Sequence, residues 1–210
     1  MNNKQSSRER RSANNFFVGN SFEVRSSPST AQKHDIYLYG EIEDATQFID
    51  AIEVMESAGE NDLVVINLST PGGNVNATDT FIHAMKGCAA KIVVIATGGV
   101  HSAGTLILLS ADEFQLSDGF HALFHNGSYG SFGKASDVKS HLEFQAAFSE
   151  LEAHRYYSGF FSSDEIRDMC NGKDFWVDAE EFMRRFEMRN EWMREQEPKD
   201  STEESIDSDL

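Results

Sequence analysis

The stretch Ala96-Thr-Gly-Gly-Val-His-Ser-Ala-Gly-Thr-Leu-Ile-Leu-Leu109 decides the fold. The apolar, β-branched run at residues 91–95 precedes it, and it ends in the apolar run 106–109, which is too short to span a membrane. This order predicts a buried strand, a tight glycine turn and a buried helix. Ser102 is therefore expected in the first turn of that helix.

A serine at this place has two interpretations. Its hydroxyl would lie among backbone N–H groups that have no intrahelical partner, at the positive end of the helix dipole, where a developing oxyanion is stabilised. That environment suits a nucleophile. Serine is also a favoured N-cap residue, so a purely structural role for Ser102 stays open at this point.

Length and composition restrict the class of protein. A chain of 210 residues fits one domain with a large core. The 18 Lys and Arg against 35 Asp and Glu, a formal charge of -17, argue against nucleic acid or an anionic membrane as the main partner. The two cysteines form neither a metal-binding spacing nor a disulfide framework. We therefore expect a soluble protein of the reducing cytoplasm.

The chain divides by composition into three parts. Residues 1–31 are rich in Ser, Asn and Arg and predict a flexible polar arm. Residues 32–192 carry the alternating strand and helix patterns and predict one α/β domain. Residues 193–210 are mostly acidic and serine-rich, which predicts an acidic disordered tail.

The first elements of the domain have the order strand, helix, strand. Residues 35–40 form a strand pattern that ends at a glycine, and residues 44–57 form an amphipathic helix pattern. Residues 62–68 are almost continuously apolar, as in strands that are buried on both faces of a parallel sheet. A parallel βαβ unit is expected.

Pro71-Gly72-Gly73 directly follows this second strand. Two glycines after a proline allow a sharp turn and a close approach of backbone N–H groups to a ligand, although such a sequence is more often only a turn. The next strand delivers Ser102 to the same edge, where the carboxyl ends of parallel strands meet and ligands bind in open α/β sheets. Two loops are therefore expected to face one site.

His125 and Asp174 are the other candidates for chemistry. His125 ends the alternating strand pattern of residues 119–125, where an exposed imidazole can act as the general base for a serine. A histidine taken alone is more often a surface or structural residue. Asp174 lies just before a short apolar strand pattern.

A long helical pattern covers residues 136–157. Phe144, Phe148 and Tyr156 give it more aromatic surface than a helix facing only solvent needs. We expect this helix to pack on another subunit as well as on its own core.

Several segments, in order, resemble the Clp protease proteolytic subunit, a serine peptidase on the crotonase-like fold. These are Ile36-Tyr-Leu-Tyr-Gly-Glu-Ile42, Ile66-Asn-Leu-Ser-Thr-Pro-Gly-Gly73, Gly98-Gly-Val-His-Ser-Ala-Gly104, Phe124-His125 and Asp174-Phe-Trp-Val-Asp-Ala-Glu-Glu181. The resemblance covers about residues 35–188. It implies an α/β fold of repeated ββα units with a protruding handle helix.

The resemblance also implies roles for single residues. Ser102 would be the nucleophile, His125 the general base and Asp174 the group that orients the imidazolium, in a triad defined by geometry rather than by chain order. Backbone N–H groups of Gly73 and Ala103 would form the oxyanion hole. An extended peptide would lie beside two loops, contacting Pro71, Gly72, Asn126 and Gly127.

The partners implied by the resemblance are a peptide or unfolded-protein substrate, further copies of the chain in stacked rings, and an ATP-dependent unfoldase. The helix 136–157 matches the handle that joins two rings into a closed chamber. No cofactor and no metal is implied for the reaction, and no phosphate-binding loop is found in the sequence.

The sequence departs from the family pattern in three places. His101 replaces a small residue before the nucleophile, Asn126-Gly127 stands where a proline is common, and residues 1–31 do not resemble the short axial loop of the family. Three alternatives therefore stay open: a catalytically silent ring or scaffold subunit, a crotonase-fold acyl-CoA enzyme, and a viral head-maturation peptidase of similar fold.

Overall fold

The computed structural model of the chain describes residues 31–196. The elements are β1 Lys33–Tyr39, the 3-10 helix η1 Ala45–Phe48, α1 Ile49–Ser57, β2 Leu63–Thr70, α2 Val75–Gly87, β3 Lys91–His101, α3 Ala103–Leu109, β4 Glu113–Leu116, β5 His121–Phe124, α4 Ala135–Tyr157, α5 Ser163–Cys170, β6 Phe175–Asp178 and α6 Ala179–Gln196. Residues 1–30 of the predicted arm and 197–210 of the predicted tail lie outside the described residues. Residues 193–196, which the composition assigned to the tail, belong to α6.

One six-stranded sheet organises these elements, in the order β1-β2-β3-β5-β6, with β4 also paired to β3. All pairs are parallel except β5 with β6, which is antiparallel. The chain is therefore an α/β protein, as the sequence predicted, and its sheet agrees with the crotonase-like fold that the resemblance implies. The predicted βαβ unit is β1, α1 and β2.

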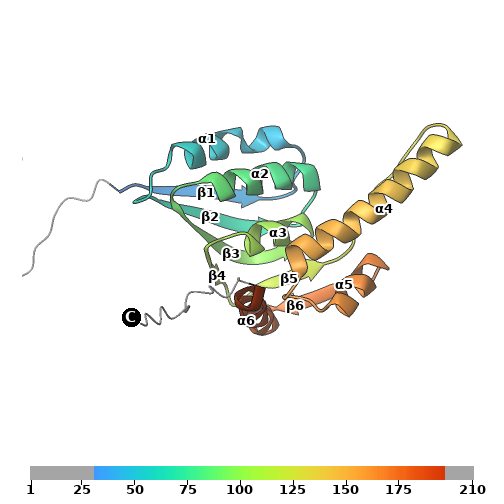
Figure 1. The fold of residues 1–210 in the computed structure, drawn as a ribbon. Helices are drawn as coiled ribbons and strands as arrows, with labels where there is room; N and C mark the ends of the chain where they lie inside the picture. The colour runs from blue at the N-terminus through green and yellow to red at the C-terminus, as the bar shows by residue number, and fades with distance from the viewer. Residues whose placement is uncertain (1–30, 197–210) are drawn as a thin grey trace, which may run out of the picture. The chain divides into compact units, whose positions relative to one another are not determined.

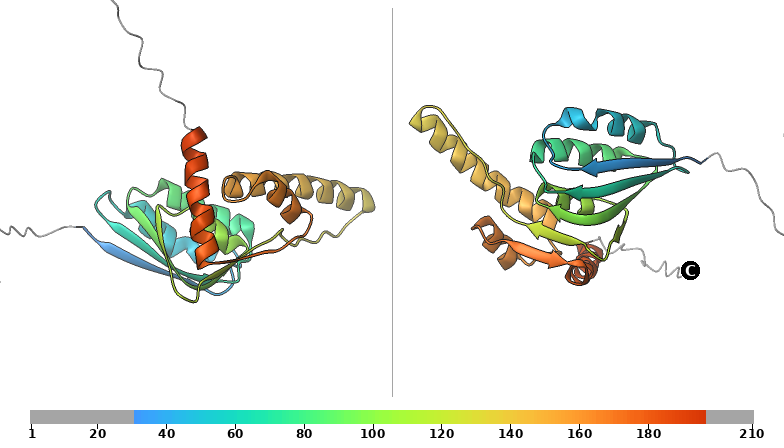
Figure 2. Two further views of the ribbon diagram at one scale, coloured as in Figure 1. Left: turned by 90° about the horizontal axis from the view of Figure 1, so that it is seen from below. Right: turned by 180° about the vertical axis from the view of Figure 1, so that it is seen from behind.

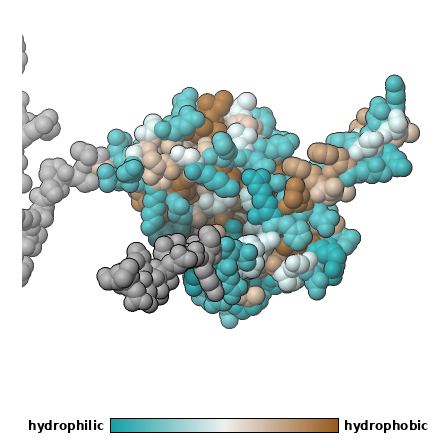
Figure 3. Space-filling model, viewed as in Figure 1, coloured by the Kyte–Doolittle hydropathy of each residue, from teal (hydrophilic) through white to brown (hydrophobic). Residues whose placement is uncertain are grey.

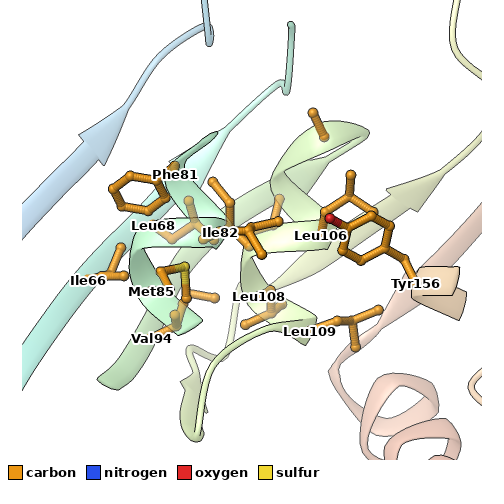
Figure 4. Packing of buried hydrophobic residues seen from close by; sticks show 14 of the residues in the cluster. Ile66, Leu68, Phe81, Ile82, Met85, Val94, Leu106, Leu108, Leu109 and Tyr156 are labelled. Carbon is orange, nitrogen blue, oxygen red and sulfur yellow. The ribbon is translucent and has the colours of Figure 1, made fainter. Parts of the chain in front are cut away.

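The helices α1, α2 and α3 cover one face of the sheet (Figure 1). The core-facing positions of β2 and β3 are buried, and Figure 4 shows Ile66, Leu68 and Val94 packed against side chains of α2 and α3. Seen from behind, the strands of the opposite face are not covered by a described helix (Figure 2). The alternation of side chains along each strand therefore gives the sheet one buried face and one more solvent-exposed face.

The predicted glycine turn before Ser102 is wrong. Strand β3 continues through Gly98 and Gly99 to His101, because Gly99, Val100 and His101 pair with residues 121–123 of β5. Glycines predict a turn from local preference, whereas pairing with a neighbouring strand keeps these two extended. The change of direction is confined to Ser102 itself.

Helix α4 extends away from the sheet (Figures 1 and 2). Leu142, Phe144 and Leu151 are exposed, and Figure 3 shows hydrophobic colour along the helix where it leaves the body. Tyr156 does not belong to this surface, contrary to the prediction. It is buried and donates a hydrogen bond to Asp79 of α2. Among residues 31–196, no helix has both the length and the apolar character that a membrane span requires.

An ion-pair network joins α6 to α5. Arg185 is 12% exposed, and it donates to Glu165 (2.8 Å) and Glu181 (2.7 Å) and to the Phe160 carbonyl (3.3 Å). Its guanidinium also lies 4.6 Å from the centre of the Phe161 ring. Several donors of one largely buried cation are therefore satisfied together, which fixes the C-terminal helix on the domain.

Replacing Arg185 by Gln is expected to lower the free energy of unfolding by about 2 kcal/mol, the scale of hydrogen bonds to charged groups. Hydrogen bonding by Arg185 lowers the pKa of Glu165, and Arg184 followed by Arg185 lowers that of Glu181 to about 2. This stabilisation is present above the unfolded-state value of 4.5 and is lost as the pH falls toward 2. In denaturant titrations, the loss of unfolding free energy caused by Arg185→Gln should therefore be smaller at pH 3 than at pH 7.

Arg184→Gln is the matched control, since it removes the same charge from an exposed residue of α6 that pairs with Glu181 but not with Glu165. We expect a change within about 0.5 kcal/mol, as for other exposed ion pairs. Equal losses in the two variants would show that the buried network does not contribute more than a surface pair.

Candidate active site

Ser102 occupies a strained turn between β3 and α3. Its φ and ψ are 52° and -126°, and it is the one non-glycine residue with positive φ among residues 31–196. Such a conformation costs about 1–3 kcal/mol and clusters at functional sites. Ser102 stands at the N-cap position, but its hydroxyl makes no capping hydrogen bond. A role as helix N-cap therefore does not explain why a serine occupies this position.

The turn is held by backbone and buried polar groups. The Ser102 N–H donates to the Leu123 carbonyl of β5 (2.8 Å), and the Ser102 carbonyl accepts from the N–H (2.9 Å) and hydroxyl (2.7 Å) of Thr105. The Thr105 hydroxyl also lies 3.0 Å from the hydroxyl of Tyr157. Burial raises the pKa of Tyr157 to about 12, so the phenol stays neutral and links α4 to the start of α3.

Three glycines allow close packing around the loop after β2, and two of them, Gly72 and Gly104, lie where β2 and this loop meet the Ser102 turn. A Cβ on Gly72 would lie 2.6 Å from the His101 carbonyl oxygen and 2.6 Å from the Ser102 Cβ, and one on Gly73 would lie 2.1 Å from the Ile42 carbonyl oxygen. A Cβ on Gly104 would lie 2.4 Å from Thr70 Cγ2. Only glycine allows these approaches, which bring the two predicted loops together.

A backbone bridge to Ile42 holds the loop after β2. The Gly72 carbonyl accepts from the Ile42 N–H (2.8 Å), and the Ile42 carbonyl accepts from the Asn74 N–H (2.8 Å). The Gly73 N–H takes no part in this bridge. Ala103 is the first residue of α3, where an N–H has no intrahelical partner. Of the two predicted oxyanion donors, Gly73 lines the same cleft as Ser102, and Ala103 directly follows Ser102 in the chain.

Ser102 and His125 line one cleft of about 490 Å³, a size typical of ligand sites. Its remaining walls come from the loop after β2, the loop after β5, α4 and the end of α5; they include Gly73, Asn126, Gly127, Tyr129, Phe148, Glu152, Met169 and Cys170. Pro71 is exposed and Gly72 is buried, and neither lines the cleft, so two of the four predicted substrate contacts lie outside it.

The antiparallel pair β5 and β6 brings His125 and Asp174 together. Phe124 pairs with Phe175, and His125 directly follows one of these residues while Asp174 directly precedes the other. His125 is half-buried and Asp174 is exposed. Within residues 31–196 the structure contains no hydrogen bond among the side chains of Ser102, His125 and Asp174. The fold supplies their proximity without the hydrogen bonds of an aligned triad.

The walls of the cleft that come from α4 and α5 were not predicted from the sequence. Cys170 is a further potential nucleophile there, but burial, followed by the negative charge of Glu150, raises the pKa of its thiol. The thiol therefore stays protonated and is a poor nucleophile. Glu152 accepts from Arg155 (3.2 Å) through Oε1, and its Oε2 has no partner among the described residues. Helical periodicity alone could not show that these positions face Ser102.

Comparison with known proteins agrees with this geometry. The chain is 32% identical over 155 residues to the ATP-dependent Clp protease proteolytic subunit 3 of Rhizobium etli, covering 71% of this chain and 79% of the relative. It is 29% identical over 154 residues to subunit 2 of Treponema pallidum (70% and 76%), and 26% identical over 140 residues to subunit 2 of Pseudomonas aeruginosa (65% and 69%). The family model described as Clp protease matches residues 23–185. A match of this extent, over a sheet that holds a strained serine beside a strand-end histidine, places the chain in the Clp protease family.

Proposed function

We propose that the chain is a serine endopeptidase in which Ser102 attacks the peptide carbonyl and His125 accepts the serine proton. The observation that carries this proposal is the strained turn at Ser102, which presents a hydroxyl not used for capping to the cleft that His125 also lines. His125 would then return the proton to the leaving amine. The N–H groups of Gly73 and Ala103 would stabilise the oxyanion of the tetrahedral intermediate.

Asp174 is proposed as the group that orients His125. Since the three side chains are not hydrogen-bonded to one another, the proposal requires a rotation of the imidazole toward both neighbours. Catalytic hydrogen bonds in unliganded sites are often long and tighten in the substrate complex. The same missing bonds favour one alternative, a catalytically silent ring or scaffold subunit.

We propose further that the chain assembles into stacked rings and receives unfolded substrates from an ATP-dependent unfoldase in the cytoplasm. Support comes from the names of the relatives, which are ATP-dependent Clp protease subunits, and from the exposed apolar side chains of α4. Phe144 and Phe148 stack with ring centres 5.8 Å apart on that helix. An apolar surface of this kind suits contact between copies of the chain.

Fluorophosphonate labelling followed by intact-mass measurement tests the peptidase proposal. We expect one adduct on the wild-type protein and none on Ser102→Ala or His125→Ala, because labelling requires a serine activated by a base. An adduct on Ser102→Ala would assign the activated serine elsewhere. No adduct on the wild-type protein, alone or with peptide substrate, would favour the silent subunit.

A further inference from the structure

Three aromatic side chains meet on the sheet face that no described helix covers. His101 ends β3, His121 begins β5 and Trp176 lies on β6. The ring centre of His101 is 5.1 Å from that of His121 and 5.4 Å from that of Trp176, and His121 and Trp176 are stacked at 6.4 Å. None of the three lines the cleft with Ser102. The peptidase proposal therefore leaves this cluster unexplained.

The two imidazoles converge above Gly99. Strand pairing places Gly99 opposite His121, and a Cβ on Gly99 would lie 2.9 Å from Nε2 of His101 and 3.0 Å from Nε2 of His121. Both Nε2 atoms thus border the same small space, which exists because residue 99 has no side chain. Two imidazole nitrogens that lie beside one point, on adjacent strands, are a possible pair of chelating ligands.

Neither nitrogen has a hydrogen-bond partner among residues 31–196, so each has an unused electron pair. Nδ1 of His121 lies 3.1 Å from the Gly119 carbonyl oxygen, which can only accept, so Nδ1 carries the hydrogen and Nε2 of the neutral ring is bare. Nε2 of His101 is buried without a hydrogen-bond partner among the described residues. Neutral imidazole commonly binds metal ions through such a nitrogen.

We infer that His101 and His121 form a binding site for a late first-row divalent metal ion, bound through the two Nε2 atoms. Imidazole suits Zn²⁺, Ni²⁺ and Cu²⁺, and affinity is expected to be highest for Cu²⁺. In residues 31–196 no group of three or more His, Cys, Asp or Glu side chains converges on a point that could hold a metal. Solvent would therefore complete the coordination, and binding is expected to be weaker than at a four-ligand structural zinc site.

Trp176 supplies a direct signal for this site, because bound Cu²⁺ and Ni²⁺ quench the fluorescence of a nearby indole whereas Zn²⁺ does not. Untagged full-length protein is titrated with NiCl2 and CuCl2, and we expect saturable quenching that an excess of ZnCl2 reverses. Trp176→Phe removes the quenched emission and assigns the signal, since Trp192 lies elsewhere, against Gly159.

Two substitutions test the geometry. His121 is exposed, so His121→Ala should fold normally, and we expect its apparent dissociation constant for Ni²⁺ to rise about tenfold or more, since even a partner outside the metal's own ligands contributes 10–100-fold. Gly99→Ala keeps both donors but fills the space between them, and the same weakening is expected. His141→Ala removes an exposed histidine of α4 and should leave the titration unchanged.

Thermal unfolding without metal shows whether each variant is folded, and calorimetric titration with NiCl2 gives a second measure of binding. The inference would be overturned if Ni²⁺ neither quenched the fluorescence of the wild-type protein nor gave a binding heat in the calorimeter. It would also be overturned if a folded His121→Ala protein bound Ni²⁺ with wild-type affinity. Fluorophosphonate labelling of the same samples reports separately on Ser102, so that failure of the metal site and failure of the peptidase proposal are distinguished.

Discussion

Replacing Ser102 by Ala is expected to lower the rate of peptide cleavage by a factor on the order of 10⁴ or more, as in other serine enzymes that lose a triad member. Alanine removes the attacking oxygen but keeps the Cβ. The turn is held by the N–H and carbonyl of residue 102, and the hydroxyl makes no capping bond. The fold and the peptide affinity should therefore be retained while the chemical step is lost.

The measurement is initial rates with a fluorogenic peptide and with unfolded casein, for Ser102→Ala, His125→Ala and the double variant. Because the nucleophile and its base act as one unit, the double variant is expected to be no slower than either single variant. Ser110→Ala, at the other end of α3, is the matched control and should keep wild-type rates. Multiplicative losses in the double variant would contradict a shared role for Ser102 and His125.

Gly72→Ala is expected to abolish cleavage and to destabilise the fold by at least about 3 kcal/mol, since it combines backbone strain with a steric collision. The φ of Gly72 is +93°, and the new Cβ would be 2.6 Å from both the His101 carbonyl oxygen and the Ser102 Cβ. Relief requires the loop to withdraw from the turn, which would carry Gly73, whose N–H is the proposed oxyanion donor, away from Ser102.

Gly40→Ala is the control for Gly72→Ala, because it introduces the same backbone strain without a steric collision. Gly40 has the same φ of +93°, but a Cβ there would meet no heavy atom within 4 Å. We expect it to cost about 1–2 kcal/mol and to keep wild-type cleavage. Urea titrations and fluorophosphonate labelling rates of both variants provide the comparison. A Gly72→Ala protein as stable and as reactive as Gly40→Ala would show that the loop need not pack against Ser102.

Much of the fold follows from periodicity in the sequence. The continuous apolar run of β2 and the amphipathic pattern of α1 predict a parallel βαβ unit, and the structure contains it. Ser102 before a buried helix and Pro71-Gly72-Gly73 after β2 predict two loops at one edge of the sheet, and the glycine approaches bring them together. These features depend on short-range preferences and on the geometry of parallel sheets, which are properties of local sequence.

Tertiary pairing decided features that local preference predicts wrongly. Gly98 and Gly99 favour a turn, yet β3 continues through them because β5 supplies partners for residues 99–101. Tyr156 has the aromatic character of a surface contact, yet its hydroxyl finds Asp79 of α2 and the ring is buried. In both cases a partner remote in the chain outweighs the preference of the residue itself.

Strand alternation, strand ends and glycine loops, all visible in the sequence, determined the α/β class, the edge at which the site lies and Ser102 and His125 as candidates. Only the tertiary structure decided the cleft walls from α4 and α5, the adjacency of His125 and Asp174, and the convergence of His101 and His121 above Gly99. The physical reason is the distance along the chain over which each feature is determined. Periodicity records which face of an element is buried, whereas contact between side chains depends on the register and packing of elements far apart in the chain.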